Sequence, residues 1–134
     1  MIVVDSSVWI DYFKGRDTEG TNRLDSLLGA ELVAIGDLML VEVLQGFRAD
    51  KDYRRARDML LSLTVLNMLD MEIALKSAEN FRKLRKMGIT VHKTIDAVIA
   101  TFCIENDFRL LHSDRDFDPF HTYLKLKNAI AVPD

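Results

Sequence analysis

The stretch Met1-Ile2-Val3-Val4-Asp5-Ser6-Ser7 determines how the rest of the chain is interpreted. Its apolar part, residues 2–4, is a run of β-branched side chains that ends at a polar triplet. A short apolar run bounded by polar residues predicts a buried strand. One of the two serines can cap a helix that reaches about Lys14. The opening therefore predicts a strand followed at once by a helix, with Asp5 at the junction.

The same alternation continues along the chain. Apolar runs predict four more strands, at 32–35, 64–68, 109–112 and 128–132. Apolar residues at helical spacing predict helices between them, around 24–28, 38–45, 53–63, 74–84 and 94–106. Strands separated by helices require crossovers and so form a mainly parallel sheet. We therefore predict an α/β fold, a three-layer sandwich with a central, mainly parallel five-stranded sheet, as a single domain over residues 1–134.

Composition limits the function classes. The net charge of −3 gives no general attraction to nucleic acid, so an enzyme acting on it would need local basic patches or bound cations. A single cysteine, Cys103, excludes an internal disulfide. The start does not resemble a signal peptide, and no apolar run approaches the roughly 18 residues of a membrane span. We expect a cytoplasmic protein without membrane contact.

Two acids follow predicted strands. In an open parallel sheet, ligands bind outside the carboxyl ends of the strands. Asp5 follows the first strand directly, and Asp114 comes shortly after the fourth. Because Asp is also a common cap and turn residue, either acid alone has a purely structural explanation as well.

Two further acids lie in apolar helices. Glu42 is the only polar residue in 38–44, and Asp96 is the only charged residue in 94–104. A buried carboxylate without a partner is costly. The helix dipole favours an acid in the first turn, so Asp96 also has a purely structural explanation. Glu42 lies in mid-helix, where the dipole does not stabilise it.

One site explains all four acids. Carboxylates about 4 Å apart repel by roughly 4 kcal/mol at an effective dielectric near 20, so a cluster needs protons or cations. Oxygen ligands suit a hard cation, Mg²⁺ or Mn²⁺. Such an ion can activate a water for phosphodiester cleavage. The sequence thus predicts a carboxylate metal site formed by Asp5, Glu42, Asp96 and Asp114.

Four segments carry a family resemblance that covers nearly the whole chain: 4–11, 42–46, 96–100 and 113–117. They resemble the PIN-domain nucleases and, more narrowly, the VapC toxins of toxin–antitoxin modules. The resemblance implies a metal-dependent endoribonuclease that cleaves RNA by metal-activated water, with Asp5, Glu42, Asp96 and Asp114 as catalytic acids. It also implies a homodimer and an antitoxin that blocks the pocket. The metal ligands that it implies are Asp5, Asp96, Asp114 and Asp116.

The resemblance extends to polar neighbours of these acids. A site hydroxyl often follows the first acid, and both Ser6 and Ser7 qualify, with Ser7 slightly preferred. Many relatives have a hydroxyl residue two positions before the fourth acid, where this chain has His112. Either Ser113 compensates or His112 contacts the phosphate. Three basic residues near predicted loops are expected to contact RNA: Lys14, Arg16 and Lys93.

Other functions fit less well. A haloacid-dehalogenase-type phosphatase needs a second Asp where this chain has Ser7, and a receiver domain needs an Asp where the third strand ends in Leu66-Asn67-Met68. A non-catalytic interaction module of the same fold would not need the complete acid set. A PIN nuclease outside toxin–antitoxin systems also stays open as an alternative.

Overall fold

The computed structural model of the protein describes residues 1–30 and 32–130. Its centre is a five-stranded sheet with the order β3-β2-β1-β4-β5. All neighbouring strands in this sheet run parallel. The strands are β1 (Ile2–Val4), β2 (Val33–Gly36), β3 (Thr64–Leu66), β4 (Arg109–Leu111) and β5 (Lys127–Asn128). The predicted α/β fold with a mainly parallel five-stranded sheet is confirmed.

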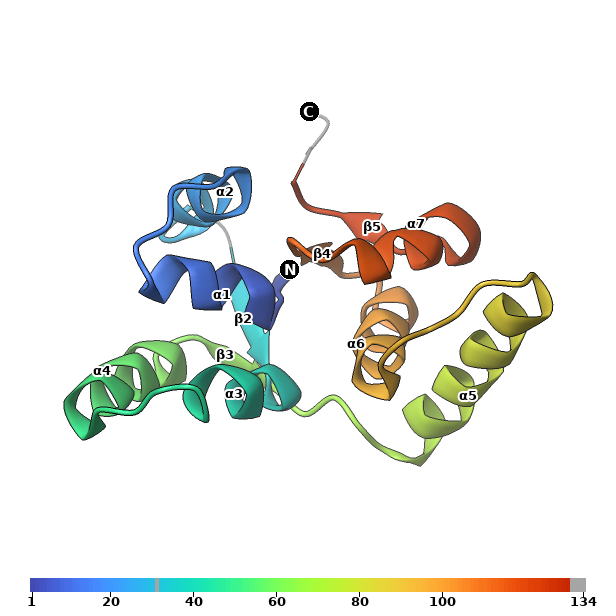
Figure 1. Ribbon diagram of the computed structural model, residues 1–134, viewed down its shortest axis with the longest axis horizontal. Coiled ribbons are helices and arrows are strands. Elements are labelled where there is room, and N and C mark those ends of the chain that lie inside the picture. Colours follow the sequence, from blue (N-terminus) through green and yellow to red (C-terminus); the bar gives the residue numbers. More distant parts are fainter. Residues whose placement is uncertain (31, 131–134) are drawn as a thin grey trace.

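Helices flank this sheet. Figure 1 shows α1 to α4 on the left of the view and α5 to α7 on the right, with strands between the two groups. None of the described helices is long and apolar enough to cross a membrane. The helices are α1 (Ser6–Phe13), α2 (Glu19–Leu27), α3 (Asp37–Leu44), α4 (Asp50–Leu61), α5 (Met71–Lys86), α6 (Thr94–Glu105) and α7 (Asp118–Leu124), with a short 3₁₀ helix, η1 (Arg115–Phe117).

The core lies around the middle strand. β1 is buried along its whole length, as expected for a parallel strand covered on both faces. Helix α6 is also buried, over the eight residues from Asp96 to Cys103. The acids at the end of β1 and at the start of α6 are therefore held by the most buried parts of the molecule.

The strand order places a switch point next to β1. The chain builds β1, β2 and β3 in one direction and then crosses to β4 and β5 on the other side of β1. In such sheets the ligand site lies outside the carboxyl ends of the strands where the order reverses. The carboxyl ends of β1 and β4 lead directly into Asp5 and into the segment 112–116, so the topology brings these residues to one edge.

The last part of the chain differs from the prediction. β5 begins at Lys127 and pairs only two residues with β4, whereas we predicted a strand over 128–132. Residues 131 and 132 of that range lie outside the described residues. The 3₁₀ helix and α7 were not predicted, because seven residues are too few for a clear helical period. Helix α7 ends at Leu124, and its C-cap residue Lys125, with a left-handed backbone (φ 67°), turns the chain toward β5.

Candidate active site

Asp5 connects the middle strand to the first helix. Its backbone N–H donates to the carbonyl of Leu111 at 2.8 Å, which fixes the ends of β1 and β4 beside each other. Its carboxylate caps α1 and accepts hydrogen bonds from the Ser7 N–H at 3.1 Å and the Ser7 hydroxyl at 2.7 Å. Burial raises the pKa of Asp5 in spite of these donors, and the nearby charge of Asp114 adds to the effect.

The Ser7 hydroxyl also connects two segments. While it donates to Asp5, it accepts a hydrogen bond from the backbone N–H of Ser113 at 3.0 Å. One hydroxyl thus links the end of β1 to the loop after β4. Ser7, slightly preferred from the sequence as the hydroxyl next to the first acid, is thus hydrogen-bonded to that acid.

Glu42 lies half-buried on α3, across from the start of α1. The Ser6 hydroxyl donates to its Oε1 at 3.2 Å. Burial is the main cause that raises the pKa of Glu42, and Asp5 contributes. The charge of Lys93 acts in the opposite direction and lowers the pKa of Glu42. Both serines after the first acid are therefore in the site, each bound to a different carboxylate.

Among these acids, Asp96 is the one with a buried carboxylate oxygen that no protein group in the described residues contacts by a hydrogen bond. It lies in the first turn of α6 and is only 5% exposed, and its Oδ2 is buried with no hydrogen-bond partner among the described residues. Burial, followed by the charges of Asp5 and Asp114, raises the pKa of Asp96 to about 7. A buried acceptor of this kind costs free energy unless a donor or a cation completes it.

Asp114 and Asp116 come from the loop after β4. Asp114 caps η1, and its Oδ1 accepts from the Asp116 N–H at 2.9 Å. One carboxylate oxygen from each of Asp96, Asp114 and Asp116 lies within 4.8 Å of the others. Three carboxylates at such a spacing form a site that a hard cation can fill through oxygen ligands alone.

The structure thus brings together all the acids predicted from the sequence. Asp5 and Glu42 interact with the serines, while Asp96, Asp114 and Asp116 converge on one point. The charges of Asp5, Asp114 and Glu42 all raise the pKa of Asp96, so the two groups act on each other electrostatically.

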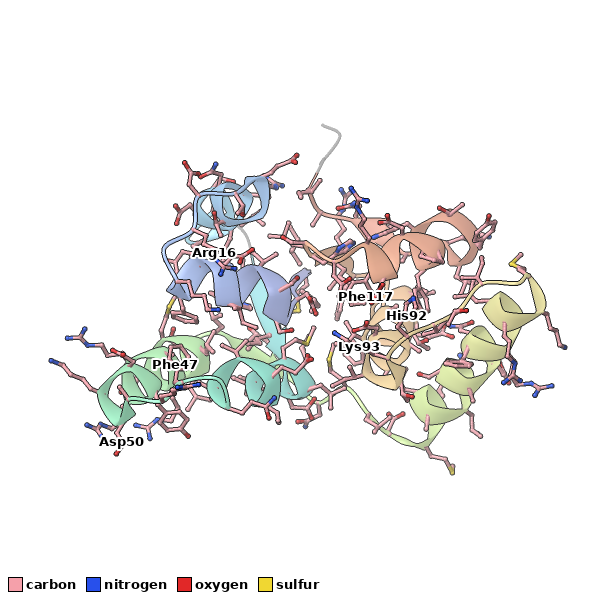
Figure 2. All side chains as sticks on the ribbon, viewed as in Figure 1. Arg16, Phe47, Asp50, His92, Lys93 and Phe117 are labelled. Carbon is pink, nitrogen blue, oxygen red and sulfur yellow. The ribbon has the colours of Figure 1, made fainter. Side chains whose placement is uncertain are left out.

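The three basic residues predicted to contact RNA differ in how they lie relative to the acids. Lys93 directly precedes α6 and acts electrostatically on both Glu42 and Asp96; Figure 2 places it between α6 and the helices α1 and α3. Lys14 lines the same pocket as Glu42. Arg16 already forms an ion pair with Asp11, at 2.8 Å.

His112 and Ser113 take different roles from those expected. His112 is 8% exposed, and its two ring nitrogens contact the Asp114 N–H and His121, so neither is left for a phosphate. Ser113 joins the site through its backbone N–H, while its hydroxyl lies against Gly20, where a Cβ would come within 2.9 Å of it. His121 lies on the unpredicted helix α7, and no residue spacing signals its contact with His112.

Comparison with known proteins agrees with this geometry. The PIN domain family model matches residues 2–120. Ribonuclease VapC11 of Mycobacterium tuberculosis is 29% identical over 131 residues, which cover 96% of this chain and 98% of the relative.

Solved structures show the same fold. VapBC2 from Rickettsia felis, in a crystal structure with a DNA fragment from its promoter, superposes with a TM-score of 0.75 at 18% identity, covering 96% of this chain and 97% of that one. VapC20 of Mycobacterium tuberculosis, described as a sarcin-ricin loop cleaving toxin, gives a TM-score of 0.69 at 16% identity, with coverage of 89% and 94%.

Proposed function

Because this chain belongs to the PIN-domain family, we propose that it is a divalent-metal-dependent endoribonuclease and the toxin of a toxin–antitoxin pair. The observation that carries the proposal is the convergence of Asp96, Asp114 and Asp116 beside Asp5 and Glu42. The ribonuclease relative, which matches along nearly its whole length, supports the reaction class.

The residues present fit a bound Mg²⁺ or Mn²⁺. All the ligand atoms are carboxylate oxygens, the donors that hard cations prefer. The Oδ2 of Asp96, which has no partner within residues 1–30 and 32–130, supplies a buried acceptor that needs positive charge. We infer that Asp96, Asp114 and Asp116 hold the cation and that Asp5 completes the set. When bound, the ion supplies Lewis-acid chemistry: it offsets the phosphate charge and lowers the pKa of a water.

The protein's own side chains orient the carboxylates and accept the proton that is released in the reaction. Ser7 holds Asp5 and the loop after β4 in register, and Ser6 aims Glu42. Glu42, whose pKa is raised, accepts the proton of the attacking water. The water oxygen then forms the new bond to phosphorus while the bond to the 3′ oxygen breaks. The products are a 5′-phosphate and a 3′-hydroxyl, the latter protonated from solvent.

RNA binding against a net charge of −3 requires local cations. Lys93 is the best placed, because it acts on both Glu42 and Asp96. Lys14 lies at the same pocket. We infer that these two lysines hold the phosphates on either side of the scissile bond, and that Arg16 joins only if RNA displaces Asp11.

The proposed toxin role includes an antitoxin that covers Glu42. Solved structures with the same fold include a toxin–antitoxin complex from Klebsiella pneumoniae. In this chain a pocket beside Glu42 has apolar walls from α1 and α3, and Phe13 and Phe47 meet edge to face with centroids 5.6 Å apart. An antitoxin segment with apolar side chains and a cation directed at Glu42 fits this pocket. The proposal also includes a homodimer and a cytoplasmic location.

Cleavage of labelled RNA tests the function. Wild type and Asp5→Asn are compared in Mg²⁺, in Mn²⁺ and in EDTA, and the product ends are mapped. We expect cleavage by the wild type in metal only, with 5′-phosphate ends, and none by Asp5→Asn. Cleavage that continues in EDTA, or that requires the 2′-hydroxyl, would contradict the proposal. An inactive wild type that also binds no Mn²⁺ would favour the non-catalytic module.

A further inference from the structure

A line of hydrogen bonds runs from the backbone of Asp114 to Leu126, just after α7. The Asp114 N–H donates to His112 Nδ1 at 3.2 Å, His112 Nε2 contacts His121 Nε2 at 2.8 Å, and His121 Nδ1 contacts the Leu126 carbonyl at 2.8 Å. The ring centroids are 5.0 Å apart and the planes differ by 21°, which fits two nearly coplanar rings meeting at their nitrogens. We call His112 and His121 the histidine relay.

The two backbone ends fix the direction of every bond in the relay. A backbone N–H can only donate and a carbonyl can only accept. His112 Nδ1 must therefore accept from Asp114, so the proton of this neutral ring is on Nε2 and is donated to His121. The proton of His121 is then on Nδ1, where it meets the Leu126 carbonyl. Both rings are neutral, and one arrangement of protons satisfies all three contacts.

The relay completes the anchoring of the loop after β4. Ser113, next to His112, donates its N–H to the Ser7 hydroxyl, and Asp114 caps η1 through the Asp116 N–H. The ring of His112 also packs against the fully buried ring of Phe117, with the two ring centroids 4.8 Å apart. The backbone N–H groups of Ser113 and Asp114 thus each have a specific acceptor. The acceptor for Asp114, His112, is itself held by His121 on α7.

We propose that His112 and His121 are positioning residues, and that the relay holds the Asp114 backbone so that the carboxylates of Asp114 and Asp116 face Asp96. The inference rests on the proposed metal-dependent function. Neither histidine touches metal or substrate in this role. Outer partners that orient metal ligands typically change metal affinity or activity by about 10–100-fold when removed.

His121→Leu tests the relay, with Phe120→Leu as the matched control. Phe120 lies on the same helix and is fully buried, so its truncation also loosens α7 but leaves the relay intact. We expect His121→Leu to weaken Mn²⁺ binding and to lower kcat by about tenfold, while the KM for RNA stays unchanged. Phe120→Leu should lower stability without either effect. Equal losses of metal affinity in both variants would overturn the proposal, because they would reflect a loosened helix.

Two variants of His112 separate the relay from simple packing. His112→Leu removes the acceptor for the Asp114 N–H. In His112→Asn the amide oxygen can accept from the N–H two residues on, as in an Asx turn, so part of the lost metal affinity should return. The double variant His112→Leu/His121→Leu should lose no more than His112→Leu alone, because both changes break one relay. Additive losses would contradict it.

Nitrogen NMR of the imidazole rings checks the relay independently of activity. We expect His112 protonated at Nε2 and His121 at Nδ1 in the metal-free protein. A proton on His112 Nδ1 would overturn the relay even if the enzyme is active. Conversely, a wild type that binds no Mn²⁺ and cleaves no RNA, while showing the expected tautomers, would refute the proposed function and leave the hydrogen-bond line itself established.

Discussion

The two sides of the acid cluster are built differently. On the serine side, Asp5 and Glu42 each accept a hydrogen bond from a hydroxyl of α1. On the cation side, formed by Asp96, Asp114 and Asp116, one oxygen of Asp96 has no protein donor in the described part of the chain. This difference supports the proposal that a cation completes Asp96.

The largest expected effect is on the cation side. Asp96→Asn keeps the shape of the side chain but removes the charge that a cation needs, so cleavage should fall by more than about 100-fold, beyond the usual cost of losing an outer partner. Asp25→Asn, an exposed acid on α2, is the control and should leave the rate unchanged. Single-turnover cleavage at saturating Mg²⁺ measures both. Substantial activity in Asp96→Asn would show that the cation side is not the metal site.

The next largest expected effect is a dependence of the free energy of unfolding on pH. The folded pKa of Asp96 is about 7, above its ordinary value of 3.8, so between these pH values the unfolded chain has lost a proton that the folded protein keeps. The free energy of unfolding of the metal-free protein should therefore fall as pH rises from about 4 to about 7, by at most about 1.4 kcal/mol per pH unit from this group.

Urea denaturation in EDTA at several pH values measures this slope. Asp96→Asn should show a shallower fall than the wild type, because it lacks the titrating group. Added Mg²⁺ should raise the free energy of unfolding of the wild type most strongly at the upper end of this pH range, where the Asp96 carboxylate is ionised. Identical slopes in the two proteins would contradict the assigned role of Asp96.

On the serine side, Ser7→Ala should have the larger effect. It removes the donor to Asp5 and the acceptor of the Ser113 N–H together, and a hydrogen bond to a charged group contributes roughly 1.5–3 kcal/mol. We expect kcat to fall by about tenfold or more. Ser7→Thr keeps the hydroxyl and should retain most of the activity. A similar loss in both variants would point to crowding rather than to the hydroxyl.

Ser6→Ala should have the smallest effect. Its single bond to Glu42 is 3.2 Å long and only partly buried, so its loss is expected to cost about 0.5 kcal/mol, which is roughly a twofold change in rate. Cleavage rates measured beside those of Ser7→Ala provide the check. A larger loss in Ser6→Ala than in Ser7→Ala would reverse the order that the geometry predicts.

Much of the site follows from the sequence because parallel strands end at one edge of a sheet. Once residues 2–4 and 109–111 are strands, Asp5 and Asp114 must lie near each other. The sequence indicates Glu42 and Asp96 because each is the lone acid in an apolar stretch, residues 38–44 and 94–104 respectively. These arguments use only periodicity and the cost of burying charge, which are local properties of the chain.

The rest depends on contacts between residues far apart in the sequence. The sequence predicts that the acids meet, but not that Ser6 and Ser7 donate to different carboxylates. Nor does it predict that one oxygen of Asp96 has no donor among the residues that the structure describes. His112 and His121 meet because η1 and α7 fold back over the end of β4, and neither element is long enough to leave a periodic signal. The sequence alone thus determined the fold class and the set of acids, because hydrophobic pattern and topology fix strand ends. Only the tertiary structure decided how each carboxylate is held, because hydrogen bonds depend on distances and directions within a few tenths of an ångström.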